Sequence, residues 1–101
     1  MDKIIDRILE ISSTHEGKDI TQMTLKCGEE FGELSQAVLS YTKAPACAYK
    51  MKTLDDVGEE IADVFIVTVA IAAKAGISKE ELKAHIENKL SRWMIKINAE
   101  K

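Results

Sequence analysis

The chain has 101 residues, the size of one small domain, so we expect a single helical domain over residues 1–101. With 46% hydrophobic and 31% charged residues, it has the composition of a globular protein and not of a disordered one. The net charge of -3 argues against nucleic acid as a partner, because broad contact with a phosphate backbone usually needs a basic surface. A nucleotide would therefore need a local site at which a metal ion offsets the charge.

Targeting signals are not apparent in the sequence. Residues 1–7 are charged throughout and lack the apolar core of a signal peptide. The longest uncharged apolar stretch is too short to span a bilayer, so no membrane partner is expected. Cys27 and Cys47 are too few for a disulfide framework, so we expect free thiols. These features predict a soluble cytoplasmic protein.

Breaks at Gly17, around Pro45 and at Gly76 divide the chain into four segments with helical periodicity. We expect helices over about residues 2–16, 21–42, 54–75 and from 78 onward. The segment 61–73 is rich in Val and Ile and could also form a strand, but its length and its flanking caps favour a helix. Four helices with short links predict an all-α, antiparallel four-helix bundle.

Two of these boundaries carry specific cap signals. Thr53 is a good N-cap for the third helix, and Gly76 suits the left-handed position that follows its C-terminus. Ser78, with Glu81 three residues later, forms a capping-box pattern at the start of the fourth helix. The apolar stripe of that helix includes Trp93, which we expect in the core or in a subunit interface.

An acidic residue interrupts the apolar face of the second helix. Glu30 lies three residues after Cys27 and four before Leu34, so it points where an apolar side chain is expected. Glu33 lies three residues further on, on a neighbouring part of the same face. Phe31, between them, is expected to pack in the core.

The third helix carries a matching pair. Asp63 is the only charged residue in the apolar run 61–73, and Glu60 shares its face three residues earlier. We expect Asp63 to be buried and the nearby Phe65 to pack in the core. Buried, unpaired carboxylates are costly, and a hard divalent cation with oxygen ligands, such as Mg²⁺, removes that cost. The alternative to a metal site is a solvated acidic surface that forms salt bridges with lysines. That alternative could account for one acidic pair at this spacing, but it accounts less well for two.

A di-iron carboxylate site would also use inward-facing glutamates, but it needs Glu-x-x-His pairs. His15 and His85 follow a serine and a leucine at that spacing, so neither fits. A di-iron site is therefore not expected.

Three segments that contain these residues, 26–34, 59–64 and 87–92, resemble the all-α nucleoside triphosphate pyrophosphohydrolase superfamily, and within it the MazG-like family. The superfamily also includes dimeric dUTPases, dCTP pyrophosphatases and phosphoribosyl-ATP pyrophosphohydrolase. The resemblance extends from about Lys26 to Arg92, which is most of the domain.

The resemblance implies a hydrolase that converts nucleoside triphosphates to a monophosphate and pyrophosphate, with Mg²⁺ as cofactor and Mn²⁺ as a substitute. It implies a homodimer or homotetramer with sites near subunit contacts. The residues that it assigns are the metal ligands Glu30, Glu33, Glu60 and Asp63 and the phosphate contacts Lys89 and Arg92. Glu30 or Glu33 would also accept a proton from the attacking water.

Two other functions stay open at this point. One is hydrolysis of phosphoribosyl-ATP on the same scaffold, and the other is a non-catalytic helical interaction module. Spacing alone fits Lys89 and Arg92 equally well to a phosphate contact and to a solvated basic face. The interaction module does not explain Asp63 within its apolar run.

Overall fold

The computed structural model describes residues 2–45 and 48–100. Their helices, in chain order, are α1 (Asp2–His15), α2 (Ile20–Tyr41), the short 3₁₀ helix η1 (Ala48–Lys50), α3 (Leu54–Ala75) and α4 (Lys79–Ala99). Because these described ranges contain no strand, the predicted all-α class with four α-helices is confirmed. Residues 61–73, where a strand was the alternative, lie inside α3.

The helix starts follow from local hydrogen bonds. At α4, Ser78 Oγ accepts a bond from the Glu81 amide at 3.1 Å, and the Glu81 carboxylate accepts one from the Ser78 amide at 3.2 Å. Thr53 and Asp56 form the same reciprocal pair at the start of α3. Both N-caps confirm the sequence prediction. A third capping box, at the start of α2, begins at Asp19.

Gly76 ends α3 in the left-handed conformation, with φ of 82°. Because an L-residue pays about 1–2 kcal/mol in that conformation, Gly76→Ala should lower the free energy of unfolding by about that amount. Gly58→Ala provides the matched control. Gly58 lies within α3 with open space around an added Cβ, so alanine there should raise the same free energy by up to about 1 kcal/mol. Urea denaturation of both variants measures this, and effects of the same sign would contradict it.

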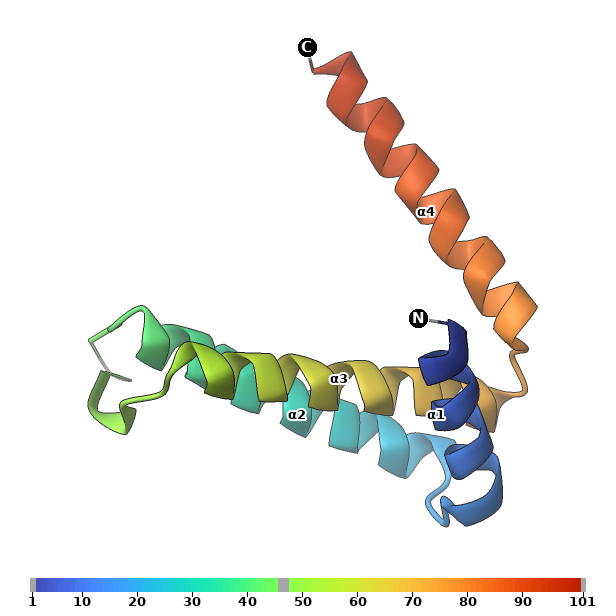
Figure 1. The fold of residues 1–101 in the computed structure, drawn as a ribbon, viewed down its shortest axis with the longest axis horizontal. Coiled ribbons are helices and arrows are strands. Elements are labelled where there is room, and N and C mark those ends of the chain that lie inside the picture. The colour runs from blue at the N-terminus through green and yellow to red at the C-terminus, as the bar shows by residue number, and fades with distance from the viewer. Residues whose placement is uncertain (1, 46–47, 101) are drawn as a thin grey trace.

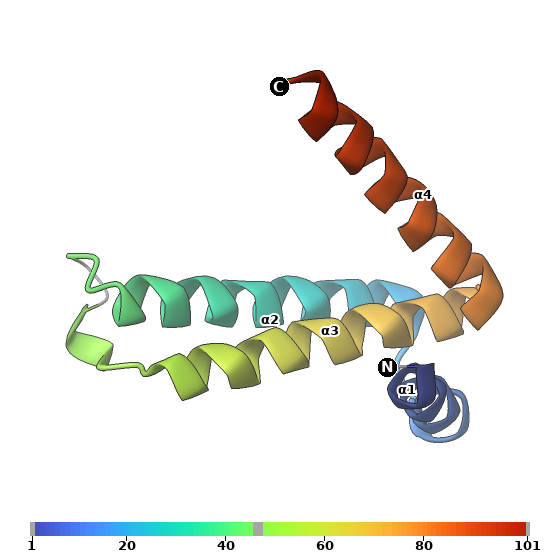
Figure 2. The same ribbon diagram turned by 45° about the horizontal axis from the view of Figure 1, so that its top comes forward.

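The helices α2 and α3 form an antiparallel hairpin, side by side along their lengths (Figures 1 and 2). Met23 and Ala37 of α2 are buried. Ser40 is buried as well, and its Oγ accepts a hydrogen bond from the Lys52 amide at 2.9 Å. The connection after α2 is thereby tied back to the hairpin.

Across one end of the hairpin lies α1, seen end-on in Figure 2. Ile5 and Ile8 of α1 form a small apolar core with Val69 of α3, and Leu82 of α4 packs against it. Two ion pairs join the start of α4 to α1: Lys79 to Asp6 and Lys83 to Asp2. These contacts hold only the first turns of α4.

Beyond those turns, α4 leaves the rest of the molecule (Figure 1), and none of its residues is buried. The four predicted helices are present, but within the single chain they do not form the predicted antiparallel four-helix bundle. The reason lies in packing: after Leu82 the apolar stripe of α4 meets no apolar face among the described residues. Trp93, in that stripe, is 64% exposed, so it is not part of the chain's own core.

The predicted core positions of two aromatic residues are also wrong. Phe31 is 60% exposed and Phe65 is exposed too, because a helix pair covered by one crossing helix leaves its outer faces uncovered.

Cys27 is a free thiol, as predicted, with Sγ 3.6 Å from Thr68 Oγ1. Cys47 lies outside the described residues. Across the described part of the chain, the apolar stretches within the helices are too short or too often interrupted by charge for any helix to span a membrane.

Candidate metal centre between α2 and α3

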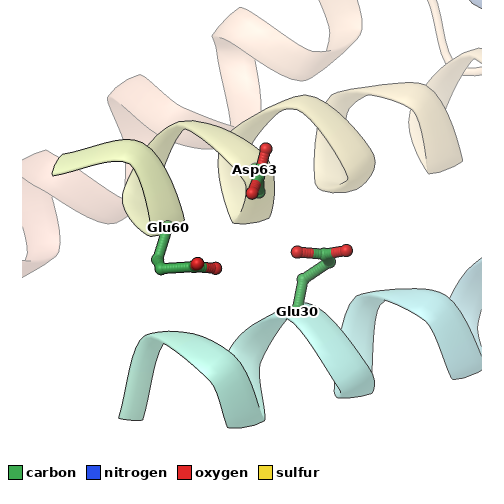
Figure 3. A group of neighbouring side chains, drawn as sticks. All are labelled: Glu30, Glu60 and Asp63. Atoms are coloured by element: carbon green, nitrogen blue, oxygen red, sulfur yellow. The ribbon is translucent and has the colours of Figure 1, made fainter. Parts of the chain in front are cut away.

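Three carboxylates meet between the helices of the hairpin (Figure 3). Glu30 comes from α2, and Glu60 and Asp63 come from successive turns of α3. One carboxylate oxygen of each residue lies within 4.8 Å of the others. Because residues three apart share a helix face, the Glu60–Asp63 spacing directs both side chains toward α2. The structure thus brings together three of the four predicted ligands.

Burial differs across this carboxylate cluster. The side chain of Glu30 is only 12% exposed, in agreement with its predicted place in the apolar seam. Glu60 is half-buried. Asp63 is exposed, so the prediction that it is buried is wrong. Asp63 is directed toward α2 but borders the open cavity between α1, α2 and α3, so its side chain stays in contact with solvent.

The cluster contains two oxygen atoms that lack a partner. Oε2 of Glu30 and Oε2 of Glu60 are both buried and accept no hydrogen bond within the described structure. Buried polar atoms are almost always satisfied, and like-charged carboxylates close together repel each other. A hard divalent cation removes both problems, because Mg²⁺ and Mn²⁺ prefer carboxylate oxygen ligands. These three residues therefore fit a divalent metal.

Lys26 forms an ion pair with the cluster. Its Nζ lies 3.1 Å from Oε1 of Glu30 and 3.6 Å from Oε1 of Glu29. The hydrogen bond to Glu30, with the charges of both glutamates, raises the pKa of Lys26. No role was predicted for Lys26, although its spacing of four residues from Glu30 is a signal visible in the sequence. It neutralises one oxygen of Glu30 and leaves the other facing the cluster.

Glu33, the fourth predicted ligand, is exposed and does not belong to the close group of three. It is nevertheless near enough for their charges to change its pKa. The charge of Glu30 is the main cause that raises the pKa of Glu33, followed by partial desolvation and by the charge of Glu60. A carboxylate with a raised pKa is a better proton acceptor than an ordinary one.

This raised pKa has a consequence for stability. A folded-state pKa above the unfolded value stabilises the protein in acid, and that contribution is lost as the pH rises through the folded-state pKa of Glu33. At neutral pH the ionised Glu33 is therefore destabilising, so Glu33→Gln should make the metal-free protein more stable. The gain should disappear on acidification into the titration range of glutamate. Urea denaturation in EDTA across this pH range measures the effect; a constant difference at all pH values would contradict it.

Two cavities adjoin the cluster, one on each side along the hairpin. The first, of about 340 Å³, borders Glu30 and Asp63 and is walled by residues of α1, α2 and α3. The second, of about 500 Å³, borders Glu33 and Glu60. The other residues that line this second cavity are Gln36, Lys50 and Lys52. No role was predicted for Lys50 and Lys52. They lie in the connection before α3, where no helical spacing indicates which way a side chain points.

The predicted phosphate contacts Lys89 and Arg92 lie on α4, which departs from the hairpin in both views (Figures 1 and 2). Neither residue lines the cavities beside the carboxylates. Within one chain the structure does not bring them to the cluster. Their role stays a prediction, and it requires α4 to lie against a carboxylate cluster in an arrangement other than that of the single chain.

The fold and the cluster together define an all-α protein with a candidate divalent-metal site across an antiparallel helix pair. Residues 25–101 match the family described as MazG-like, so the chain belongs to the MazG-like family, which includes nucleoside triphosphate pyrophosphohydrolases. The match begins within α2 and includes all of α3 and α4, whereas α1 precedes it. Comparison with curated proteins and with solved structures gave no match.

Proposed function

We propose that the protein is a Mg²⁺-dependent nucleoside triphosphate pyrophosphohydrolase that releases a nucleoside monophosphate and pyrophosphate, a reaction suited to nucleotide-pool housekeeping. The observation that carries this proposal is the Glu30–Glu60–Asp63 cluster, with its two buried carboxylate oxygens that lack a partner. Membership of a family that includes such hydrolases supports the same reaction.

In this proposal Glu30, Glu60 and Asp63 hold the cation, and Glu33 lies beside them as a further ligand or as the proton acceptor. When bound, Mg²⁺ supplies charge neutralisation at the substrate phosphates and keeps coordination positions open for them. Mn²⁺ accepts the same oxygen ligands and is the expected substitute.

The reaction requires a base for the attacking water. We assign this role to Glu33, because it borders the cluster and its pKa is raised by the neighbouring charges of Glu30 and Glu60. The water oxygen forms a bond to the α-phosphorus while its proton passes to the Glu33 carboxylate. The bond from the α-phosphorus to the bridging oxygen breaks, and pyrophosphate leaves with that oxygen and its electron pair.

Self-association belongs to the same proposal. Large apolar side chains in the stripe of α4 are exposed, among them Ile86, Leu90 and Trp93, and an exposed apolar patch of this kind marks an interaction site. We infer that α4 packs against a second copy in a homodimer or homotetramer. In that assembly the α4 of one copy brings Lys89 and Arg92 to the carboxylates of the other.

The experiment that tests the function is pyrophosphate release from a panel of standard and modified nucleoside triphosphates, with and without Mg²⁺. Wild type should release pyrophosphate only with the metal, and Glu33→Ala should lose most of the rate because proton transfer contributes about 10²–10⁴-fold. Phosphoribosyl-ATP is included in the panel, so that release from it alone identifies the specialised hydrolase. A folded protein that neither releases pyrophosphate nor binds Mg²⁺ would favour the interaction module.

A further inference from the structure

The two cavities beside the cluster differ in chemistry, and this difference gives the site a direction. Glu33 follows Glu30 by one turn of α2, and Glu60 precedes Asp63 by one turn of α3. Because the helices are antiparallel, Glu33 and Glu60 lie toward η1, and Glu30 and Asp63 lie toward α1 (Figures 1 and 2). One cavity therefore opens at the α1 end of the cluster and the other at the η1 end.

We propose that the nucleotide lies across the cluster in one orientation, with its base in the cavity at the α1 end and its pyrophosphate end over Lys50 and Lys52. This inference rests on the proposed function and adds the binding pose. It also identifies α1, which precedes the segment matched by the family, as a wall of the base pocket.

The cavity at the α1 end has the character of a base pocket. Its apolar walls come from Ile11 of α1 and from Ile66, Val67 and Ala70 of α3. Ser12 and His15, on the same side of α1, bring hydrogen-bonding side chains to the rim. A volume of about 340 Å³ is within the range of small-molecule sites, and apolar walls with a few polar groups are typical of them. The nucleobase is the part of the substrate that combines an apolar face with a polar edge.

Lysines border both cavities, but those at the α1 end are ion-paired: Lys18 with Glu16, and Lys26 with Glu29 and Glu30. The lysines at the η1 end form no ion pair among the described residues, so that cavity suits phosphate better than a base. Lys50 and Lys52 line it, and a hydrogen bond from Lys50 to Gln36 holds the first of these ammonium groups near the carboxylates. Lysine ammonium groups bind phosphate as point charges. Pyrophosphate released at this end leaves from the side of the α2–α3 connection, away from the base pocket.

The test compares two ligands in the presence of Mg²⁺ by calorimetry: a nucleoside triphosphate with a methylene bridge between its α- and β-phosphates, and inorganic triphosphate. Ile66→Trp fills the base pocket and should weaken nucleotide binding by at least about tenfold, since apolar contacts in a pocket discriminate ligands by about 10- to 200-fold. Binding of inorganic triphosphate should stay unchanged. Leu25→Trp places the same side chain at an exposed site that lines neither cavity, so it is the matched control.

A second pair of variants tests the other end of the pose. Lys50→Gln combined with Lys52→Gln should weaken both ligands by the same factor. Lys3→Gln combined with Lys74→Gln removes equal charge at exposed positions outside both cavities and should change neither. His15→Ala supports the Ile66 result without adding bulk: it is exposed, so its loss leaves the core intact, and it should weaken the nucleotide alone.

The outcomes separate this pose from the proposed function. Wild type that binds both ligands equally, or an Ile66→Trp variant that binds nucleotide as well as Leu25→Trp does, would overturn the pose and leave the hydrolase proposal standing. Loss of inorganic triphosphate binding in Ile66→Trp, with circular dichroism unchanged, would also overturn it. Wild type that binds neither ligand with Mg²⁺ would overturn the pose and the proposed function together.

Discussion

Glu60→Gln should raise the melting temperature of the metal-free protein and abolish the rise that Mg²⁺ produces in wild type. Both effects follow from one atom: Oε2 of Glu60 is buried without a hydrogen-bond partner, near the carboxylates of Glu30 and Asp63. No ion pair of Glu60 offsets this repulsion among the described residues. The amide removes the charge and can donate a hydrogen bond to a neighbouring carboxylate.

In the presence of Mg²⁺, Glu60→Gln should melt at a lower temperature than wild type. A ligand that binds only the folded state stabilises it by about 2.7 kcal/mol at a concentration of 100 times its dissociation constant. Loss of groups that merely orient metal ligands costs about 10–100-fold in affinity, so loss of a direct ligand should cost at least about 100-fold and remove that stabilisation. An acid with only a structural role would not give this reversal.

Thermal melts in EDTA and in a Mg²⁺ series measure both effects. Glu59→Gln is the matched control, because it removes the same charge from an exposed neighbouring residue outside the cluster. It should keep the wild-type response to Mg²⁺. If Glu60→Gln shows the same Mg²⁺-dependent rise as Glu59→Gln, Glu60 is not a ligand.

Local signals in the sequence were sufficient to predict the helices and the caps of α3 and α4, whereas the Asp19 capping box of α2 was missed. Thr53, Gly76 and Ser78 each act through hydrogen bonds or backbone conformation within a few residues, so the sequence around them specifies the boundary. The meeting of Glu30 with Glu60 and Asp63 was also predictable, because each pair follows helical spacing and a short connection makes the two helices neighbours.

The misjudged features depend on tertiary packing. The spacing of Asp63 indicated which face of α3 it occupies, but its exposure depends on whether another helix covers that face. The same is true of Phe31 and Phe65. The apolar stripe of α4 was visible in the sequence, but periodicity does not distinguish a partner in the same chain from one in a second copy.

The cavities depend on packing even more strongly. The one at the α1 end exists because α1 crosses the hairpin, and no local pattern predicts that crossing. His15 shows the consequence. Its sequence context indicates only a polar residue at the end of a helix, whereas the fold brings it to the wall of a cavity beside the carboxylates.

Because α4 departs from its own hairpin, we expect Arg92 to complete the carboxylate site of a second copy and not that of its own chain. Mixing Glu60→Gln protein with Arg92→Ala protein should restore pyrophosphate release, although each variant alone is nearly inactive. If α4 acts on the partner's carboxylates, a mixed dimer contains one site with both lesions and one site with none. Random exchange in a two-fold dimer makes about half of the dimers mixed, so about one quarter of the wild-type rate should return.

An α4 that acts within its own chain gives the opposite result, because every site in the mixture then retains one lesion and the rate stays at the level of the variants. Leu90→Glu controls for assembly. It places a charge in the exposed apolar stripe of α4 without altering Lys89, Arg92 or the carboxylates. The variant should therefore be a monomer, as measured by light scattering. Adding Leu90→Glu to both partners should abolish the restored activity. If pyrophosphate release recovers in the mixture but not when both proteins also carry Leu90→Glu, subunit contact completes the site, and not exchange of metal or substrate.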